Sequence, residues 1–540
     1  MKSTVVRSPW LALALVLSLC LSLSFASWDA EDVGRGSRRW QEGGDDEGRS
    51  GSGSGRPYHF GEESFREWAK SRHGHFKVLE RFDHELLRGS IGDYRVACLD
   101  AAPRAFLQPS HYDADEIAFV REGEGVLVLL RNGKRESFCV REGDVFVIPA
   151  GSIVYSANTH RSKWFRVVML LNPVSTPGSF QEFSPIGFGG EQPQSFFSVF
   201  SDEVIQAAFN TRQREDVDRV FQRKSRGEGP ISEGSEEQIR ELSRSCSRGG
   251  RGGGGGSGSE KEDIQPRSLT GEKPRYSNKH GRFHQITGDQ CHHLRKLDMD
   301  VTLVNITRVK HPRRVYRLFC SIMQRIGAPK PSRVFFVVRA CMQGSMTALR
   351  YATRSTRIYI VVEGRDGYFE MACPHVSSFG RSERREHEQE REREHGHGRR
   401  SEEREREHGQ GRRSEERKDE QGRQEEEQGR GQEQEKSRGY RQVRAQIKVG
   451  SVIVLPAGHP ATFVAGNEGN LALLSFGVGA NNDEEVFVTG GNSVLKQLDD
   501  AAKALAFPQQ ARELADRVIR AQPESVFVAG PQQQRRVADM

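Results

Sequence analysis

The residues of this 540-residue chain that are suited to chemistry are few, and their spacing matches no common catalytic motif. The sequence contains no GxSxG nucleophile elbow, no CxxC pair and no glycine-rich phosphate loop. Nucleophilic hydrolysis and nucleotide chemistry therefore lack candidate residues. The adjacent His292 and His293, and the histidines of a charged repeat, offer imidazole groups to a metal ion, but solvated chain is the simpler interpretation.

Cysteines and one sequon complete the reactive candidates. Of the eight cysteines, one leaves with the signal segment described below, and the other seven lack the regular spacing of a disulfide framework. Cys98 and Cys139 occur in apolar strand-like runs, which favours small buried residues, with a single bridge as the alternative. Asn305, in Asn-Ile-Thr, is a possible N-glycosylation site inside an apolar run, so burial before glycan transfer competes with modification.

Residues 1–26 have the pattern of a secretory signal peptide, with a basic start, an apolar stretch and small residues before the cleavage point. Residues 27–56 are rich in Gly, Ser, Asp, Glu and Arg, and we expect them to be disordered. No later stretch approaches the ~20 continuous apolar residues of a membrane span, so we expect a soluble mature protein. The net charge of +7 comes from 81 basic and 74 acidic residues, an imbalance too small to indicate nucleic-acid binding.

Short apolar runs alternating with turn residues predict many antiparallel strands in the first half of the chain. Asn132-Gly133 predicts a hairpin turn with positive φ. The apolar residues then change to a helical period, so we assign residues 57–224 to one β-domain with a helical extension. A polar, Gly-rich linker is expected over residues 225–271.

The second half of the chain repeats the first. GDVFVIPAG at 143–151 and GSVIVLPAG at 450–458 share their Gly, Val, Val, Pro, Ala and Gly residues, which indicates an internal duplication. We therefore assign residues 272–540 to a second β-domain with its own helical extension. Within it, residues 380–439 are nearly all Glu, Arg, Gln, Gly and His, so a disordered insertion is expected.

Residues 309–343 form another insertion, of unusual character. The runs on either side, VNITR and GSMTALRY, would join into one strand-and-turn passage, whereas the insertion is basic, irregular and contains two cysteines. A retained intron explains this interruption, and a genuine surface loop is the alternative.

Several of these segments resemble sequences of the vicilins, the 7S globulins of the cupin superfamily. The two GxxxxxPxG segments are similar to the second conserved cupin motif, and PSHYDADEIAFVREGEG, RSTRIYIVVEGRDGYFEMACPH and PAGHPATFVAGN are similar to vicilin passages, above all to those of cereal embryo globulins. The resemblance covers most of residues 58–530 outside the linkers and insertions. It implies a mainly β bicupin, with two jelly-roll β-barrels that are each followed by a short helical region.

The resemblance also implies positions for a metal site. Cupin enzymes typically hold a divalent metal with two His and one Glu from the first motif and one His from the second, a set suited to open-site metal chemistry. In the first barrel His111 and Glu116 match one His and the Glu, but Pro109 and Val154 replace the other two ligands. We interpret His111 and Glu116 as vestigial, with a metal-dependent enzyme that uses them as the alternative.

The second barrel departs further from the metal-binding pattern. Arg357 stands at the Glu position and Ala461 at the second-motif His position, while His459 is offset by two residues and is expected to point elsewhere. The first-motif His positions are surrounded by Leu349, Arg350 and Tyr351. Because a guanidinium repels a divalent ion, we expect no metal, no cofactor and no catalytic residue in either barrel.

A chain without a catalytic site fits the function that the resemblance implies, a seed storage protein. We expect a nutrient reservoir in the protein storage vacuole of embryo or aleurone, reached through the secretory pathway and degraded by processing and germination proteases. The resemblance implies a homotrimer, docked through the helices near Ser195–Phe221 and Val494–Ala521, whose apolar faces suit that role. No enzyme activity is expected. A sugar-binding or antimicrobial vicilin-like protein is a further alternative.

Overall fold

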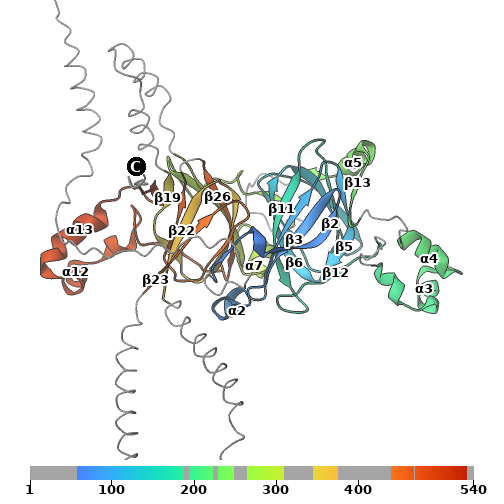
Figure 1. The fold of residues 1–540 in the computed structure, drawn as a ribbon, viewed down its shortest axis with the longest axis horizontal. Helices are drawn as coiled ribbons and strands as arrows, with labels where there is room; N and C mark the ends of the chain where they lie inside the picture. Colours follow the sequence, from blue (N-terminus) through green and yellow to red (C-terminus); the bar gives the residue numbers. More distant parts are fainter. Residues whose placement is uncertain are drawn as a thin grey trace, which may run out of the picture. The chain divides into compact units, whose positions relative to one another are not determined.

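A computed structural model describes residues 57–187, 194–222, 229–248, 264–308, 344–374, 440–466 and 469–531. The expected signal peptide 1–26, the segment 27–56 and the insertions 309–343 and 380–439 lie outside the described residues. Figure 1 shows two β-barrels, one containing β2, β3, β5, β6 and β11 and the other containing β19, β22, β23 and β26. Two barrels with helical extensions confirm the predicted mainly β fold class.

The first barrel consists of two seven-stranded sheets. One has the order β15-β9-β6-β11-β4-β3-β2, and its strands are β2 (Phe65–Ser71), β3 (Gly74–Leu79), β4 (Arg95–Ala101), β6 (Ala114–Glu122), β9 (Asp144–Ile148), β11 (Phe165–Pro173) and β15 (Arg267–Ser268). The other has the order β12-β5-β10-β7-β8-β14 with β13 beside β5, and its strands are β5 (Ala105–Tyr112), β7 (Glu124–Arg131), β8 (Lys134–Arg141), β10 (Ile153–Asn158), β12 (Glu182–Phe183), β13 (Ile231–Glu233) and β14 (Ser247–Arg248).

The second barrel is built in the same way. One sheet has the order β1-β24-β21-β26-β18-β17-β16, formed by β1 (His59–Phe60), β16 (Tyr276–Asn278), β17 (Gly281–Ile286), β18 (Met299–Ile306), β21 (Thr356–Glu363), β24 (Val452–Leu455) and β26 (Leu471–Val478). The other has the order β23-β22-β25-β19-β28 with β20 and β27 attached, formed by β19 (Ser345–Thr347), β20 (Arg350–Ala352), β22 (Gly367–Cys373), β23 (Arg441–Ile447), β25 (Ala461–Ala465), β27 (Glu485–Phe487) and β28 (Phe527–Ala529).

In the part of the chain that the structure describes, helices follow the strands of both barrels: α3 (Asp202–Phe209), α4 (Arg214–Phe221) and α5 (Glu236–Ser243) after β12, and α12 (Asp500–Ala506) and α13 (Arg512–Arg520) after β27. Two further short helices lie between strands, α2 (Glu85–Ile91) between β3 and β4 and α7 (His292–Lys296) between β17 and β18. Ser201 and Asp499 cap α3 and α12, because their side-chain oxygens accept from backbone N–H groups of the first helical turn. The predicted hairpin turn is confirmed: Asn132 and Gly133 have φ of 49° and 68° and join β7 to β8.

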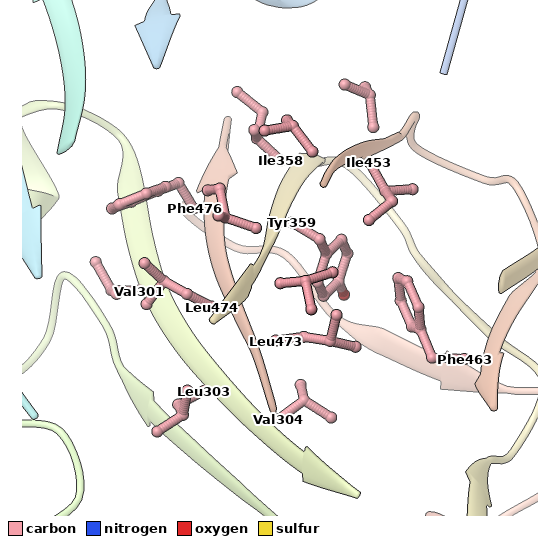
Figure 2. Packing of buried hydrophobic residues seen from close by; sticks show 14 of the residues in the cluster. Val301, Leu303, Val304, Ile358, Tyr359, Ile453, Phe463, Leu473, Leu474 and Phe476 are labelled. Atoms are coloured by element: carbon pink, nitrogen blue, oxygen red, sulfur yellow. The ribbon is translucent and has the colours of Figure 1, made fainter. Parts of the chain in front are cut away.

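Strand β6 contributes to two apolar cores. Ala118 and Val120 belong to the core of the first barrel, whereas Ile117 and Phe119 belong to a cluster that continues through the second barrel. Successive residues of a strand point to opposite faces, so a strand that is buried on both sides has uninterrupted apolar sequence. Figure 2 shows part of the second-barrel cluster, which includes residues of β18, β21, β24, β25 and β26.

Each barrel also contains a short strand that lies outside its own run of barrel strands in the sequence. β1 precedes the first barrel in sequence but pairs with β24, aligning His59 with Ile453. β15 follows the first barrel's helices and pairs with β9, aligning Arg267 with Val145. β9 and β24 are the strands of the duplicated segments, and each would be an edge strand without this partner.

The duplication extends to the backbone angles of the repeated segment. Gly143 and Gly450 have φ of 89° and 90°, and Gly151 and Gly458 have φ of 74° and 75°. L side chains are strained at positive φ, so the turns before and after β9 and β24 both require glycine.

The Gly-rich linker is shorter than its sequence suggests. Residues 229–248, inside the expected linker 225–271, form β13, α5 and β14 on the first barrel, and Cys246 makes a disulfide with Cys139. The interpretation of Cys139 as an unpaired buried residue is therefore wrong. Its partner Cys246 lies beside β14, a strand of two residues, which is too short to leave a periodic pattern in the sequence. Cys98 is a half-buried thiol, and burial raises its pKa to about 12.

Loss of this disulfide should destabilise the first barrel, because the bond joins residues 107 positions apart and restricts the unfolded chain. We expect Cys246→Ser to lower the free energy of unfolding by about 2–4 kcal/mol, measured by urea denaturation. The double variant Cys139→Ser/Cys246→Ser should lose a similar amount, since either change removes the bond. Wild-type stability in Cys246→Ser would contradict this role.

Candidate functional site

His111 and Glu116 lie on consecutive strands, but their side chains do not meet. The His111 ring stacks on Phe183 of β12, with 5.0 Å between ring centroids. Its neighbours Ser110 and Tyr112 point to the opposite face of β5, and Tyr112 packs against the first-barrel core. Glu116 is close enough to Tyr112 to perturb its titration, whereas the charge that acts on His111 is that of Asp113. The two vestigial ligand residues therefore face different surroundings.

The strand register shows which side chains of β5 face the interior of the first barrel. Val154 is the cross-strand partner of Ser110, and Glu182 of β12 is the partner of Tyr112. Cross-strand partners share a face, so these four side chains lie on the interior face. The register thus places Ser110 and Tyr112 on the interior face of β5, and Pro109 and His111 on the opposite face.

Glu116 and Glu182 form a buried acidic pair in this interior. Glu116 is 4% exposed, and burial together with the charge of Glu182 raises its pKa to about 8. Burial also raises the pKa of Glu182 and lowers the pKa of His111. Near neutral pH Glu116 is therefore mostly a neutral acid, and metal coordination would first require loss of its proton.

The second barrel has a small pocket at the corresponding place. Its free volume is about 10 Å³, on the order of one water molecule. The rings of Tyr359 and Phe463, labelled in Figure 2, close its apolar side with 4.8 Å between their centroids. Its ionisable lining consists of Arg350, Arg357, Tyr351, Tyr359, His459 and Glu485.

Arg357 occupies the cupin glutamate position and is held between carboxylates. It is 3% exposed; Nη1 donates to Asp300 at 2.7 Å, and Nη2 donates to Asp300 and Asp483, both at 3.0 Å. Asp483 is itself fixed by the Ser355 hydroxyl at 2.6 Å and by the backbone N–H of Arg354 at 2.7 Å. Although burial opposes the charged form, the carboxylates of Asp300 and Glu485 raise the pKa of Arg357. A permanent cation thus stands where a metal would need an anionic ligand.

Arg350 and Glu485 complete the charged network. Arg350 Nη1 lies 3.5 Å from one carboxylate oxygen of Glu485, and Arg357 Nε lies 3.5 Å from the other. The Arg350 guanidinium also lies over the Phe283 ring, 5.1 Å from its centroid. Each guanidinium of the pocket therefore has a carboxylate at ion-pair distance.

His459 is among the residues that line this pocket, and its ring also approaches that of Tyr58, with 6.4 Å between ring centroids. Strand alternation does not apply to His459, because it lies in the turn before β25. Its Nδ1 lies 3.0 Å from the Ala457 carbonyl oxygen. Although burial opposes protonation, Cys373 and this carbonyl raise the pKa of His459.

The two barrels share one arrangement with opposite charges. Glu182 in β12 pairs with β5, and Glu485 in β27 pairs with β20. Glu182 faces the acid Glu116, whereas Glu485 faces the cation Arg357. Sequence reasoning missed both glutamates, because each lies in a strand of two or three residues, without a motif, far along the chain from its partner.

Asn305 lies within β18, as its apolar surroundings predict. It is half-buried and pairs with Arg282 of β17 and Ala472 of β26. The Thr307 hydroxyl of the same sequon donates to the Lys279 carbonyl at 2.9 Å. A glycan would have to be attached before these strands pair, and glycosylation of Asn305 stays a prediction.

The described parts of the chain contain no group of three or more His, Cys, Asp or Glu side chains arranged to hold a metal ion. In the same parts no helix is long and apolar enough to cross a membrane. Two jelly-roll barrels with a duplicated strand motif and substituted ligand positions define a bicupin.

Comparison with known proteins agrees with this class. The Cupin family profile matches residues 78–216 and 328–512. The chain is 53% identical over 531 residues to Cupincin of Oryza sativa subsp. indica, covering 98% of each chain, and 37% identical over 480 residues to Globulin-1 S allele of Zea mays, covering 88% of this chain and 71% of the maize protein. A crystal structure of vicilin from Solanum melongena, described with different anionic ligands in structurally similar pockets, matches with a TM-score of 0.65 and 27% identity, over 88% of this chain and 99% of the vicilin.

The chain belongs to the cupin family and, within it, to the vicilin-type 7S globulins. Cereal globulins are among its relatives, as the sequence resemblance implies.

Ionisation of Glu116 should destabilise the first barrel as the pH rises. Its pKa of about 8 in the folded protein exceeds the ordinary value of 4.5, so the folded state keeps a proton that the unfolded state releases. This contribution is complete below pH 4.5 and is lost as the pH rises to about 8, by up to about 1.4 kcal/mol per pH unit. We expect Glu116→Gln to flatten the decline of the unfolding free energy between about pH 5 and 8, measured by urea denaturation.

The control is Glu67→Gln, at a partly exposed residue of β2 that pairs with Lys70 on the surface. It should retain the wild-type pH dependence. An unchanged slope in Glu116→Gln would show that this carboxyl does not titrate as described.

Removal of Arg357 should destabilise the second barrel, because Asp300, Asp483 and Glu485 would lose their shared counter-ion. We expect Arg357→Ala to lower the free energy of unfolding by about 3–5 kcal/mol, measured by chemical denaturation. Arg354→Ala is the control, since Arg354 joins the network only through its backbone N–H, and it should change stability by less than about 0.5 kcal/mol. Equal stability of the two variants would contradict a structural role for the Arg357 pairs.

Proposed function

We propose that the protein is a seed storage protein, a store of nitrogen and amino acids that proteolysis mobilises at germination. The observation that carries the proposal is Arg357, a buried cation held by Asp300 and Asp483 where a cupin enzyme has a carboxylate ligand. Membership of the vicilin-type globulins supports it. We place the protein in the protein storage vacuole of embryo or aleurone, reached through the secretory pathway by way of the signal segment 1–26.

The composition of the chain suits this role. Residues 380–439 consist almost entirely of Glu, Arg, Gln, Gly and His, and Arg and Gln side chains are rich in nitrogen. Exposed segments with small and polar residues are preferred sites of proteolytic nicking. Processing and germination proteases are therefore the proposed partners, and no nucleic acid or membrane partner is proposed.

Abundance through development tests the proposal. We expect the protein to be among the major proteins of mature seed and to disappear over the days of germination, with early cleavage in the Gly-rich and Glu/Arg-rich segments. Quantitative mass spectrometry of protein bodies from staged seeds measures both. A low, constant amount in vegetative tissue and seed would contradict a storage role.

The main rival is a metal-dependent enzyme that uses His111 and Glu116. Geometry opposes it, because the His111 ring stacks on Phe183 while Glu116 faces the interior as a largely protonated acid. Metal analysis of the purified native protein separates the two functions. Stoichiometric manganese, iron or copper together with substrate turnover would favour the enzyme.

We further propose a homotrimer that is docked through the helical extensions. Apolar side chains of these helices are exposed in the single chain, including Val220 at 68%, Leu505 at 90% and Val518 at 63%. Exposed apolar side chains on amphipathic helices favour association with another copy.

Charged residues on these helices should prevent trimer formation. We expect the wild-type protein to have about three times the mass of one chain by size-exclusion chromatography with light scattering, and Leu505→Asp/Val518→Asp to have the mass of one chain. Val174→Asp, an exposed valine outside the helices, should leave the trimer intact. A monomeric wild-type protein would contradict the assembly.

Anion binding of the kind described for the Solanum melongena vicilin is not part of this proposal. In the second barrel Glu485 already offers a carboxylate to Arg350 and Arg357.

A further inference from the structure

Two buried arginines of the second-barrel pocket converge on one carboxylate. Arg350 and Glu485 have side chains that are 4% exposed, and that of Arg357 is 3% exposed. Each carboxylate oxygen of Glu485 faces a different guanidinium at 3.5 Å. Arg350 Nη1 and Arg357 Nε make no hydrogen bond within the described residues. Glu485 therefore interacts with both guanidinium groups as a counter-ion at ion-pair distance.

The two arginines depend on Glu485 to different degrees. Asp300 and Asp483 hold Arg357 through hydrogen bonds of 2.7 to 3.0 Å. Among the described carboxylates, Glu485 alone lies within ion-pair distance of Arg350. A guanidinium buried without a counter-ion is strongly unfavourable. Arg350 therefore requires an anion in the pocket.

The chain itself delivers that anion. Glu485 begins β27, a strand of three residues that pairs with β20, the strand of Arg350. Glu485 is the direct partner of Ala352, and Arg350 lies two residues before Ala352 on the same face of β20. The strand pairing thus holds the carboxylate at the position that a free carboxylate would occupy.

We propose that the second-barrel pocket is a carboxylate-binding site whose occupant is the chain's own Glu485, a tethered ligand that closes the site to free small carboxylates. Its recognition elements are Arg350 Nη1 and Arg357 Nε, one for each carboxylate oxygen. The site is small, with free space for about one water molecule beside Glu485. It goes beyond the storage function and does not depend on it.

Chemical rescue tests the tethered ligand. Glu485→Ala removes a CH₂–COO⁻ group, and acetate supplies a carboxylate and one carbon of the same size. The full chain is unfolded thermally at constant ionic strength and neutral pH, with acetate replacing chloride. Because a ligand that binds only the folded state stabilises it in proportion to its occupancy, acetate should raise the Tm of Glu485→Ala by about 5 °C at roughly 50-fold its Kd.

Three controls should show no difference between acetate and chloride. The wild-type pocket is filled by Glu485, and Glu485→Gln fills it with a neutral side chain of the same shape. Glu370→Ala removes a carboxylate that lies at the same 3.5 Å from Arg444 but on the surface, where the two side chains are 32% and 51% exposed. Pivalate, a larger carboxylate, should fail to stabilise Glu485→Ala because the vacated space is too small.

Equal acetate responses in Glu485→Ala and the wild type would overturn the proposal, as would an acetate response in Glu485→Gln that matches that of Glu485→Ala. If Glu485→Ala does not fold in chloride, its soluble yield after refolding is compared in acetate and chloride. A higher yield in acetate than in chloride supports the tethered ligand, and equal yields contradict it.

Discussion

The closing of each barrel's open sheet edge by a short strand from elsewhere in the chain is the constraint on which the rest of the structure depends. β9 and β24 carry the duplicated segments, and each would leave a row of unpaired backbone groups at a sheet edge. β15 covers the first edge and β1 covers the second. Each barrel is thus completed by residues that lie outside its own repeat. The shared apolar cluster also joins residues of both repeats, because it includes Ile117 of β6 and Ile358 of β21.

Within this common frame the two interiors diverged in charge. Each barrel receives a glutamate from a short strand, Glu182 in the first and Glu485 in the second. In the first barrel this glutamate meets Glu116, and the repulsion is relieved by retention of a proton. In the second it meets two guanidinium groups, and the charges neutralise one another. Both solutions disfavour a divalent cation, one by protonating a ligand and the other by replacing it.

Fold does not determine function, and the stability of these barrels rests on contacts between distant parts of the chain. The ion network around Arg357 and the disulfide at Cys139 fasten elements that lie far apart in sequence. The helices after each barrel have a different character, since Val220 and Leu505 expose apolar surface that a single chain leaves uncovered. The proposed storage role would use both properties, because stable interiors resist unfolding and exposed apolar helix faces can pack against other copies of the chain.

The sequence by itself determined the features that depend on local pattern. Period-two apolar runs, the Asn132-Gly133 turn and the repeated glycines predicted two β-domains, because these signals lie within a few neighbouring residues. The resemblance to cupins implied that the domains are barrels and that Arg357 stands at the metal-binding glutamate position. Only the tertiary structure decided which way side chains point and which distant residues meet. Successive side chains of a strand point to opposite faces, so Tyr112 of β5 lies near Glu116, whereas His111 packs on Phe183. The partners Cys246, Glu182 and Glu485 lie in segments too short to have a period, so the folded sheets alone bring them to Cys139, Glu116 and Arg350.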